Sequence, residues 1–263
     1  MLKISGKEGR PYSLLFRGVS FSIPYEVGVV AALQNLSPDI LKSASRIYGS
    51  SSGSIVATTG LCGCDMGKGC RFFFYIYIYI LLMEYGVAHV KTSLLGLVPG
   101  GRMIRLLRRL LNKFLPPNAH ELVSGKLHII LTRLHDWRSV TVSEFASREE
   151  LIQVGAATAA PSGRSWVTFA AWPRPTAQNP RMVWVGWVFK AHPVPGLTIT
   201  VSAFAGEYDI CPKDGPLHLQ AVGAMSPLQQ PSCPDCHLPL QVMNHFYIQG
   251  YQDTVSFLKK LSK

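Results

Sequence analysis

Hydrophobic and polar positions along the chain follow two alternating patterns, which predict strands and helices in turn. Short apolar runs that end at turns predict strands at 13–16, 47–48, 127–131, 140–142 and 197–204. Helical spacing, or an unbroken run of small residues, predicts helices at 25–36, 54–61, 101–114, 147–153 and 250–260. Strands alternating with helices are typical of an α/β domain, here with a short extension.

Residues 101–114 show the clearest helical pattern in the chain. The apolar positions are Met103, Ile104, Leu106, Leu107, Leu110, Leu111 and Phe114. The basic positions between them are Arg102, Arg105, Arg108, Arg109 and Lys113. Two interpretations stay open. The basic face is either solvated on a helix that packs into the core, or it meets anionic lipid headgroups.

Two stretches have unusual composition. Residues 72–83, FFFYIYIYILLM, form the longest apolar run, but a transmembrane helix needs about 20 residues. Residues 160–195 hold four of the five tryptophans, contain no Asp or Glu, and show no period. The start, MLKISGKEGRPYS, lacks the apolar core of a secretory signal. We therefore expect an intracellular chain without a signal peptide or membrane span.

Composition and charge exclude several classes of protein. Hydrophobic residues make up 48% of the 263 residues and charged residues 16%, which excludes a disordered tail, a collagen and a coiled coil. The net charge of +11 favours anionic partners. Since no common nucleic-acid-binding motif is present, we expect no nucleic acid partner. A lipid surface and a merely basic exterior are the alternatives that remain.

Cysteine and histidine spacing does not select a metal or cofactor site. The cysteines are Cys62, Cys64, Cys70, Cys211, Cys233 and Cys236. Cys233-Pro-Asp-Cys236-His237 matches a haem attachment pattern, which would require export. A zinc half-site with Cys62 and Cys64 is an alternative, but their spacing is too short for the usual knuckle. We expect reduced thiols, no metal and no cofactor, and structural or surface roles for the histidines, including His128 and His135.

The segment Gly49-Ser50-Ser51-Ser52-Gly53 fits the pattern G-x-S-x-G, with Ser51 at its centre. It lies between the predicted strand 47–48 and the predicted helix 54–61. This is the context of a nucleophile on a tight strand-to-helix turn, where flanking side chains would clash and glycine is favoured. The helix amino terminus then supports developing negative charge. The alternative is an ordinary serine-rich loop.

A second glycine turn lies upstream, after the first predicted strand. Gly18 stands in the segment Phe16-Arg17-Gly18-Val19-Ser20-Phe21. A glycine turn in this position can aim backbone N–H groups at an oxyanion. A nucleophile and oxyanion donors together are what an acyl-transfer site needs.

Several stretches of the chain resemble one family. These are 13–36 together with IYGSSSG, GKLHIILTRLHDWRSVTVSEFASREELIQ at 125–153, TITVSAFAGEYDICPKD at 198–214 and GYQDTVSFLKKL at 250–261, with KTSLLG at 91–96. On these motifs the chain resembles the patatin-like phospholipase domain family, in the branch of adipose triglyceride lipase, adiponutrin and acylceramide transacylase. The resemblance covers about two thirds of the chain.

The resemblance implies a patatin-like three-layer α/β sandwich with a central, mostly parallel sheet, partly disrupted around 160–195. It implies a patatin-like domain over 12–205, with atypical segments at 70–84 and 160–195, and a C-terminal helical extension over 206–263. It also implies a serine lipid acyl hydrolase or transacylase that works at a lipid droplet or membrane surface, with an unidentified protein co-activator as a further partner. Ser51 would be the nucleophile, Gly18 the oxyanion glycine, and Gly49 and Gly53 the motif glycines.

The chain departs from the family where the resemblance implies a catalytic base. The family carries an Asp in an Asp-Gly-Gly or Asp-Gly-Ala motif, but no Asp lies between Asp136 and Asp209 here. Asp214-Gly215 follows the last strand and does not match, and we interpret Glu26, Asp209 and Asp253 as noncatalytic. Arg17 and Ser20 also replace small residues of the oxyanion loop. The sequence thus leaves three alternatives: an acyl hydrolase or transacylase, an inactive lipid-surface or partner-binding protein, and a chain that does not fold stably.

Overall fold

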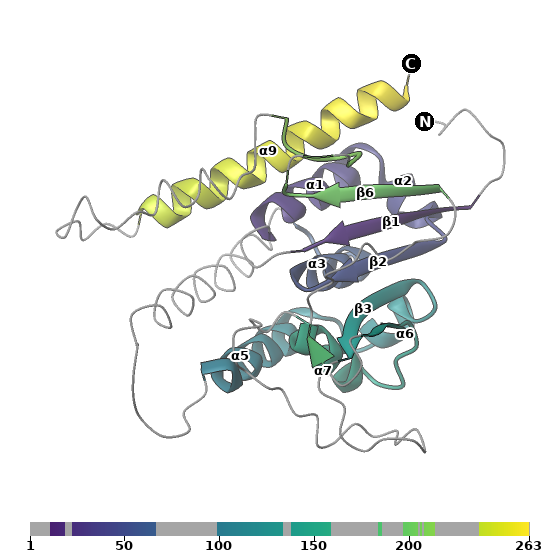
Figure 1. Ribbon diagram of the computed structural model, residues 1–263, viewed down its shortest axis with the longest axis vertical. Coiled ribbons are helices and arrows are strands. Elements are labelled where there is room, and N and C mark those ends of the chain that lie inside the picture. The colour runs from purple at the N-terminus through teal and green to yellow at the C-terminus, as the bar shows by residue number, and fades with distance from the viewer. Residues whose placement is uncertain are drawn as a thin grey trace.

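The protein is described by a computed structural model covering residues 11–18, 23–66, 99–133, 138–158, 184–185, 197–204, 206, 208–213 and 237–262. A six-stranded sheet forms its centre (Figure 1). Five strands follow the order β4-β3-β2-β1-β6, and β5 pairs with β3 off this path. The strands are β1 Tyr12–Arg17, β2 Arg46–Ser50, β3 Leu127–Arg133, β4 Arg138–Val142, β5 Trp184–Val185 and β6 Leu197–Ser202.

The register brings the carboxyl ends of the central strands to one edge of the sheet. β1 runs parallel to both β2 and β6, and Arg17 pairs with Ser50 on one side and Ser202 on the other. β3 runs parallel to β2, with Ile130 opposite Ser50. β4 and β5 are antiparallel to β3. This central, mostly parallel sheet with its helices confirms the predicted α/β fold class.

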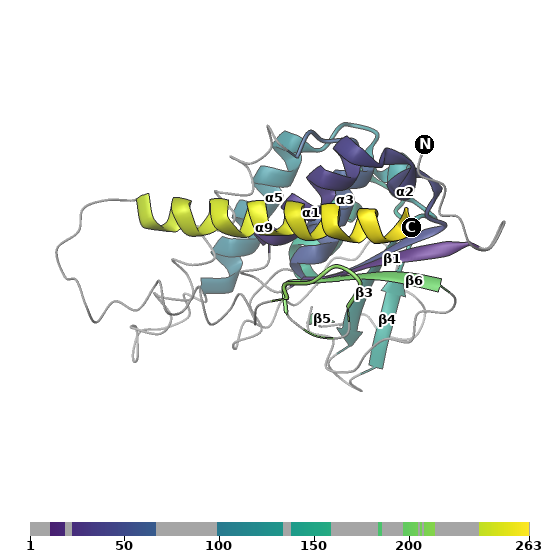
Figure 2. The same cartoon turned by 90° about the horizontal axis from the view of Figure 1, so that it is seen from above.

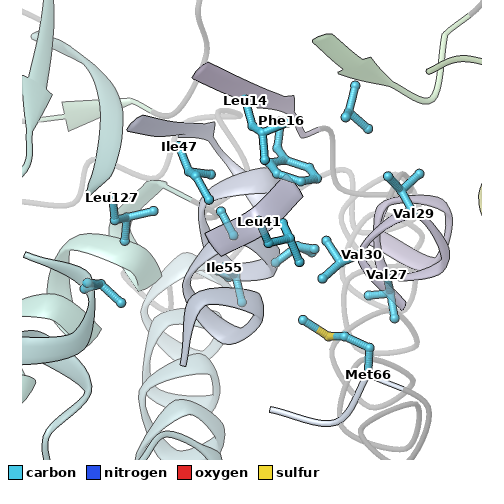
Figure 3. Packing of buried hydrophobic residues seen from close by; sticks show 14 of the residues in the cluster. Leu14, Phe16, Val27, Val29, Val30, Leu41, Ile47, Ile55, Met66 and Leu127 are labelled. Carbon is cyan, nitrogen blue, oxygen red and sulfur yellow. The ribbon is translucent and has the colours of Figure 1, made fainter. Parts of the chain in front are cut away.

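Helices pack on the sheet and close the core. They are α1 Ile23–Leu36, α2 Pro38–Ser43, α3 Ser52–Leu61, α5 Pro99–Phe114, α6 Ala119–Val123, α7 Arg148–Thr158 and α9 His237–Leu261. In Figure 2, α1, α2, α3 and α9 lie on the same side of β1 and β6. Leu14 and Phe16 of β1 are fully buried against this side, near Val30 of α1 (Figure 3). Burial of each such side chain contributes about 1.5–3 kcal/mol.

Helix α9 crosses α1 at very short range through two glycines. A Cβ on Gly28 of α1 would lie 2.1 Å from the carbonyl oxygen of Tyr247, and one on Gly250 of α9 would lie 2.1 Å from that of Tyr25. Phe246 and Leu258 of α9 belong to the buried core. The crossing therefore joins the end of the chain to the first helix after β1.

The Tyr25 hydroxyl strengthens this crossing by donating a hydrogen bond of 2.9 Å to the carboxylate of Asp253. Burial raises the pKa of Tyr25 far above its ordinary value, and the negative charge of Asp253 raises it further. Tyr25 is consequently a neutral donor at any ordinary pH. The interpretation of Asp253 as noncatalytic is consistent with this contact.

The ten predicted elements are all present, whereas α2, α6 and β5 were not predicted, and the largest difference in bounds is at α9. The sequence predicts a helix over 250–260, but α9 begins at His237. Gly250 therefore lies inside α9, where it contacts the backbone of Tyr25. Pro239 is tolerated because it lies in the first helical turn, where its missing N–H costs no helical hydrogen bond.

Helix α7 has a hydrogen-bonded cap at its amino terminus. The Glu150 amide donates a 3.1 Å hydrogen bond to the Ser147 hydroxyl, and the Glu150 carboxylate accepts a 2.7 Å bond from the Ala146 amide. The apolar run at 72–83 and all of 160–195 except β5 lie outside the described residues. Within the described helices, none combines the length and apolar character needed to cross a membrane.

Candidate active site

Ser51 occupies the turn between β2 and α3, at the carboxyl edge of the parallel strands. Its backbone angles are φ 51° and ψ −129°, and among the described residues it is the only non-glycine residue with positive φ. Such a conformation costs about 1–3 kcal/mol and is retained where the surrounding structure enforces it. A serine on a strained strand-to-helix turn is the geometry of a nucleophile elbow.

Three glycines allow this turn to pack closely. A Cβ on Gly49 would lie 2.6 Å from the Cα of Ser54, and one on Gly53 would lie 2.5 Å from the carbonyl oxygen of Phe16. A Cβ on Gly18 would lie 2.0 Å from the amide nitrogen of Gly53. The atoms that a side chain would meet at these positions belong to the backbone, so they cannot move aside by changing a side-chain rotamer. The structure therefore brings together all four site residues predicted from the sequence.

Two hydroxyl side chains that sequence reasoning missed support the turn. Ser54 donates a 2.7 Å hydrogen bond to the carbonyl oxygen of Ser51 and shares a 2.8 Å bond with the hydroxyl of Thr158. Thr158, at the end of α7, also lies 3.4 Å from the Ser51 carbonyl oxygen. Both residues are fully buried. Ser54 directly follows the motif and could have been considered, but no local pattern points to Thr158, which is distant in sequence.

The electrostatic setting of Ser51 comes from α3, a helix of 10 residues. Ser51 stands at the N-cap position, yet its side chain makes no capping hydrogen bond, so the hydroxyl is not used to close the helix. The positive end of the helix dipole and the N–H groups of the first turn lie at this point. Ser51 is 9% exposed, whereas Ser52 is 1% exposed. The arrangement can support negative charge beside the Ser51 side chain.

The neighbouring oxyanion segment is described only up to Gly18. The Gly18 amide donates a 3.2 Å hydrogen bond to the carbonyl oxygen of Ser50, which fixes the end of β1 against the motif. Arg17 donates a 2.6 Å hydrogen bond to the Tyr208 hydroxyl, and its guanidinium lies 5.6 Å from the centre of the Tyr208 ring. The large residue that replaces a small one at position 17 is therefore held by the segment after β6. Ser20 lies outside the described residues.

Other polar candidates lie away from Ser51 or serve the fold. The ring of His128 in β3 packs at 47° to that of Tyr48, with ring centroids 4.9 Å apart, and its Nδ1 lies 3.1 Å from the carbonyl oxygen of Lys126. Asp209 accepts hydrogen bonds of 2.8 Å from the amide and hydroxyl of Thr200. Glu26 is completely buried in α1. His135 falls outside the described residues.

The cysteines of the described residues do not assemble a metal site. Cys62 ends α3 and Cys64 follows it, and burial raises the pKa of the Cys62 thiol to about 12. Within the described ranges, no three His, Cys, Asp or Glu side chains gather as metal ligands would. Cys70, Cys233 and Cys236 lie outside those ranges. A buried thiol with a raised pKa is also a poor nucleophile at neutral pH.

A serine on a strained strand-to-helix turn of an α/β sheet has the backbone geometry of a nucleophile elbow, as found in α/β-hydrolases. Sequence comparison narrows this class. No family model matches the chain. The omega-hydroxyceramide transacylase of Homo sapiens is 32% identical over 274 residues, covering 98% of this chain and 47% of that protein. Patatin-like phospholipase domain-containing protein 2 of Homo sapiens is 32% identical over 263 residues, covering 95% of this chain and 49% of that protein.

These matches confirm the resemblance to the patatin-like phospholipase domain family, and nearly the whole chain is homologous to its members. The chain spans about half the length of the curated relatives it matches. Among solved structures, VipD from Legionella pneumophila aligns with a TM-score of 0.47 and 14% identity, covering 96% of this chain and 67% of that one.

Proposed function

We propose that the protein is a patatin-like lipid acyl hydrolase or transacylase in which Ser51 forms an acyl-enzyme. The Ser51 hydroxyl oxygen would attack the ester carbonyl and lose its proton, and the departing alcohol would take up that proton as the ester bond breaks. Water or a second alcohol would then accept the acyl group and return the proton to Ser51. These two steps need no cofactor, and we propose none.

The single observation that carries this proposal is the strained backbone of Ser51. Positive φ is uncommon at serine and costs about 1–3 kcal/mol, and residues strained in this way cluster at functional sites. Gly49 and Gly53 have backbone atoms where side chains would lie, which is what a sharp nucleophile turn requires. The relatives named as a transacylase and a phospholipase support the same class of chemistry.

Stabilisation of the oxyanion is proposed to involve the first turn of α3 and the segment at Gly18. The amide of Gly18 itself donates to Ser50, so its proposed role is close approach to Gly53. The N–H groups at the start of α3 are the proposed donors. Removing one such donor typically costs 100-fold to 1000-fold, or about 3–4 kcal/mol, in the rate of acyl transfer.

Among the described residues, we assign no general base to Ser51. Between α7 and β6, where the family carries its Asp, the described residues contain only β5. Trp184 of β5 pairs with Arg133, beyond the point where β3 pairs with Ser50 of β2. An unassisted serine hydroxyl is a weak nucleophile near neutral pH, so we expect activity below that of a complete dyad.

The proposed substrates are acyl esters of neutral lipids or phospholipids, presented at a lipid droplet or membrane surface. A protein co-activator is a further proposed partner. The domain boundary between 205 and 206 also stays a prediction.

Incubation of the purified protein with emulsified triacylglycerol, with and without a long-chain alcohol, would test the function. The expected result is free fatty acid, or an ester of the added alcohol, in amounts that fall to background for Ser51→Ala. Ser52→Ala is the matched control, because it removes a neighbouring hydroxyl from the same motif. Products that persist in Ser51→Ala, or a folded parent protein that forms none, would overturn the proposal; the second result would favour an inactive lipid-surface protein.

A further inference from the structure

Two buried hydroxyl groups meet beside the Ser51 turn. Ser54 lies in the first turn of α3, and Thr158 is the last residue of α7. Their hydroxyl oxygens are 2.8 Å apart, although the two residues are 104 positions apart in the chain. Both side chains are fully buried, so they depend on hydrogen-bond partners inside the protein. The pair therefore joins α7 to the helix that carries the candidate nucleophile at its start.

The carbonyl oxygen of Ser51 is an acceptor for this pair. The Ser54 hydroxyl donates to it at 2.7 Å and the Ser54 amide at 3.1 Å, while the Thr158 hydroxyl oxygen lies 3.4 Å away. The direction of the carbonyl depends on the ψ angle of Ser51, which is −129°. A change in ψ moves the oxygen relative to its donors and weakens bonds that depend on angle. The hydroxyl contacts thus oppose relaxation of the strained turn.

The two hydroxyl groups hold two hydrogens but make three short contacts. The third contact is 2.8 Å from the Thr158 hydroxyl to the carbonyl oxygen of Gly155. Each hydroxyl donates one hydrogen. If Thr158 donates to Ser54, Ser54 can donate to Ser51, but if Ser54 donates to Thr158, Ser51 loses this donor. If both donate to carbonyls, no hydrogen lies between the two hydroxyl oxygens. The first arrangement fills the bond between the hydroxyls and the shortest contact, that to Ser51.

The Ser51 carbonyl shares a peptide group with the N–H of Ser52. The group is planar, and among the described residues no peptide bond is cis, so this N–H points opposite to the carbonyl. At a nucleophile elbow, the N–H of the residue after the nucleophile donates to the oxyanion. Holding the Ser51 carbonyl therefore also fixes the direction of a proposed oxyanion donor.

We propose that Ser54 and Thr158 are positioning residues for the reaction of Ser51. Thr158 donates to the Ser54 hydroxyl, and Ser54 donates to the Ser51 carbonyl. This chain of two hydrogen bonds orients the peptide group between Ser51 and Ser52. The pair acts through the Ser51 turn and not on the ester. The inference rests on the proposed function of Ser51 as an acyl nucleophile, and its test separates the failure of one from that of the other.

The rate of fluorophosphonate labelling at Ser51, expressed per folded molecule of the full chain, tests the proposal. A misplacement of 1 Å can cost about 100-fold in rate, and the Ser54 amide keeps its bond, so about a 20-fold loss is expected for Ser54→Ala. Thr158→Val removes the second donor in the chain and is expected to cost about fivefold. The loss should appear in the limiting rate at saturating probe, since neither change removes a contact with the probe.

Two further variants distinguish positioning from a general loss of stability. Because Thr158 acts through Ser54, the double variant Ser54→Ala with Thr158→Val should react as slowly as Ser54→Ala alone, and not by the product of the two losses. Thr158→Ser keeps the hydroxyl, so its labelling rate should stay within about twofold of the parent rate.

Thr59→Val is the matched control in the same helix. Thr59 is 1% exposed, and its hydroxyl lies 3.0 Å from the carbonyl oxygens of Ile55 and Val56. The variant removes a buried hydroxyl that bonds to helix carbonyls other than that of Ser51. It is expected to lower the melting temperature but to change the labelling rate per folded molecule by less than about twofold.

Four results would overturn the proposal. Parent rates in Ser54→Ala would show that the turn does not need this hydroxyl. Equal rates in Thr158→Val and Thr158→Ser would show that the Thr158 hydroxyl has no role. Losses that multiply in the double variant would show that the two residues act independently. These three results leave Ser51 reactive, whereas a folded parent protein without label would overturn the proposed function, and this role with it.

Discussion

The Ser51 turn and the crossing of α1 with α9 both depend on glycines, but the two regions use them differently. At the turn, Gly18, Gly49 and Gly53 surround a serine with positive φ, so close packing maintains a strained backbone. At the crossing, Gly28 and Gly250 bring two regular helices together without a strained residue between them. The comparison shows that close packing at the turn accompanies a strained serine, whereas at the crossing it joins two unstrained helices.

Gly18→Ala should have the largest effect on stability and reactivity, because the added methyl group would clash with the Ser51 turn itself. The new methyl would lie 2.0 Å from the amide nitrogen of Gly53, a backbone atom in the motif. We expect a loss of about 3 kcal/mol in the free energy of unfolding, and loss of Ser51 reactivity even in the folded fraction. Urea unfolding and active-site labelling at matched folded fraction would check this. Normal labelling of the folded variant would show that Ser51 does not need Gly18 for its reactivity.

Gly28→Ala should destabilise the protein without disabling the turn. Its methyl would lie 2.1 Å from the Tyr247 carbonyl oxygen and would force α9 away from α1, at a cost of about 2 kcal/mol. Labelling per folded molecule should stay at the parent level. Gly155→Ala in α7 is the control, because nothing lies within 4 Å of its added methyl. That control should be neutral or stabilising by up to about 1 kcal/mol.

Tyr25→Phe tests the polar contact at the same crossing. It removes the hydrogen bond to Asp253, so we expect a loss of about 1.5 kcal/mol in unfolding free energy. A double-mutant cycle with Asp253→Asn would isolate the pairwise contribution. Fully additive single effects would mean that the bond contributes no coupling.

The smallest expected effect is a pH dependence from His128. Burial lowers its pKa below the ordinary value of 6.5, and the positive charge of Arg46 lowers it further, against opposing contributions from the Lys126 carbonyl and Glu144. The folded state thus favours neutral His128. Its contribution to stability is complete above 6.5 and is lost as pH falls from there through the lower folded pKa. The urea midpoint of His128→Gln should depend less on pH in this range than that of the parent protein. An equal dependence on pH in the two proteins would show that His128 does not cause it.

Local patterns predicted the turn but not the crossing. The strand before the motif at 49–53 and the helix after it are its neighbours in sequence. The glycines two positions before and two positions after Ser51 indicate a sharp turn. The contact of Gly250 with Tyr25 could not be predicted, because it joins residues far apart in the chain. Thr158 was missed for the same reason, since its contacts with Ser51 and Ser54 exist only after α7 has packed on α3. Helix α5 was predicted correctly because its period is strong over its whole length.

The central claim is that the Ser51 turn holds a reactive nucleophile. Treatment of the parent protein with a fluorophosphonate, followed by intact mass and peptide mapping, tests it most directly. We predict one phosphonyl group per molecule, located on Ser51, absent from Ser51→Ala and present in Ser52→Ala. A cooperatively folded parent protein that remains unlabelled, or that is labelled on another residue, would contradict the claim.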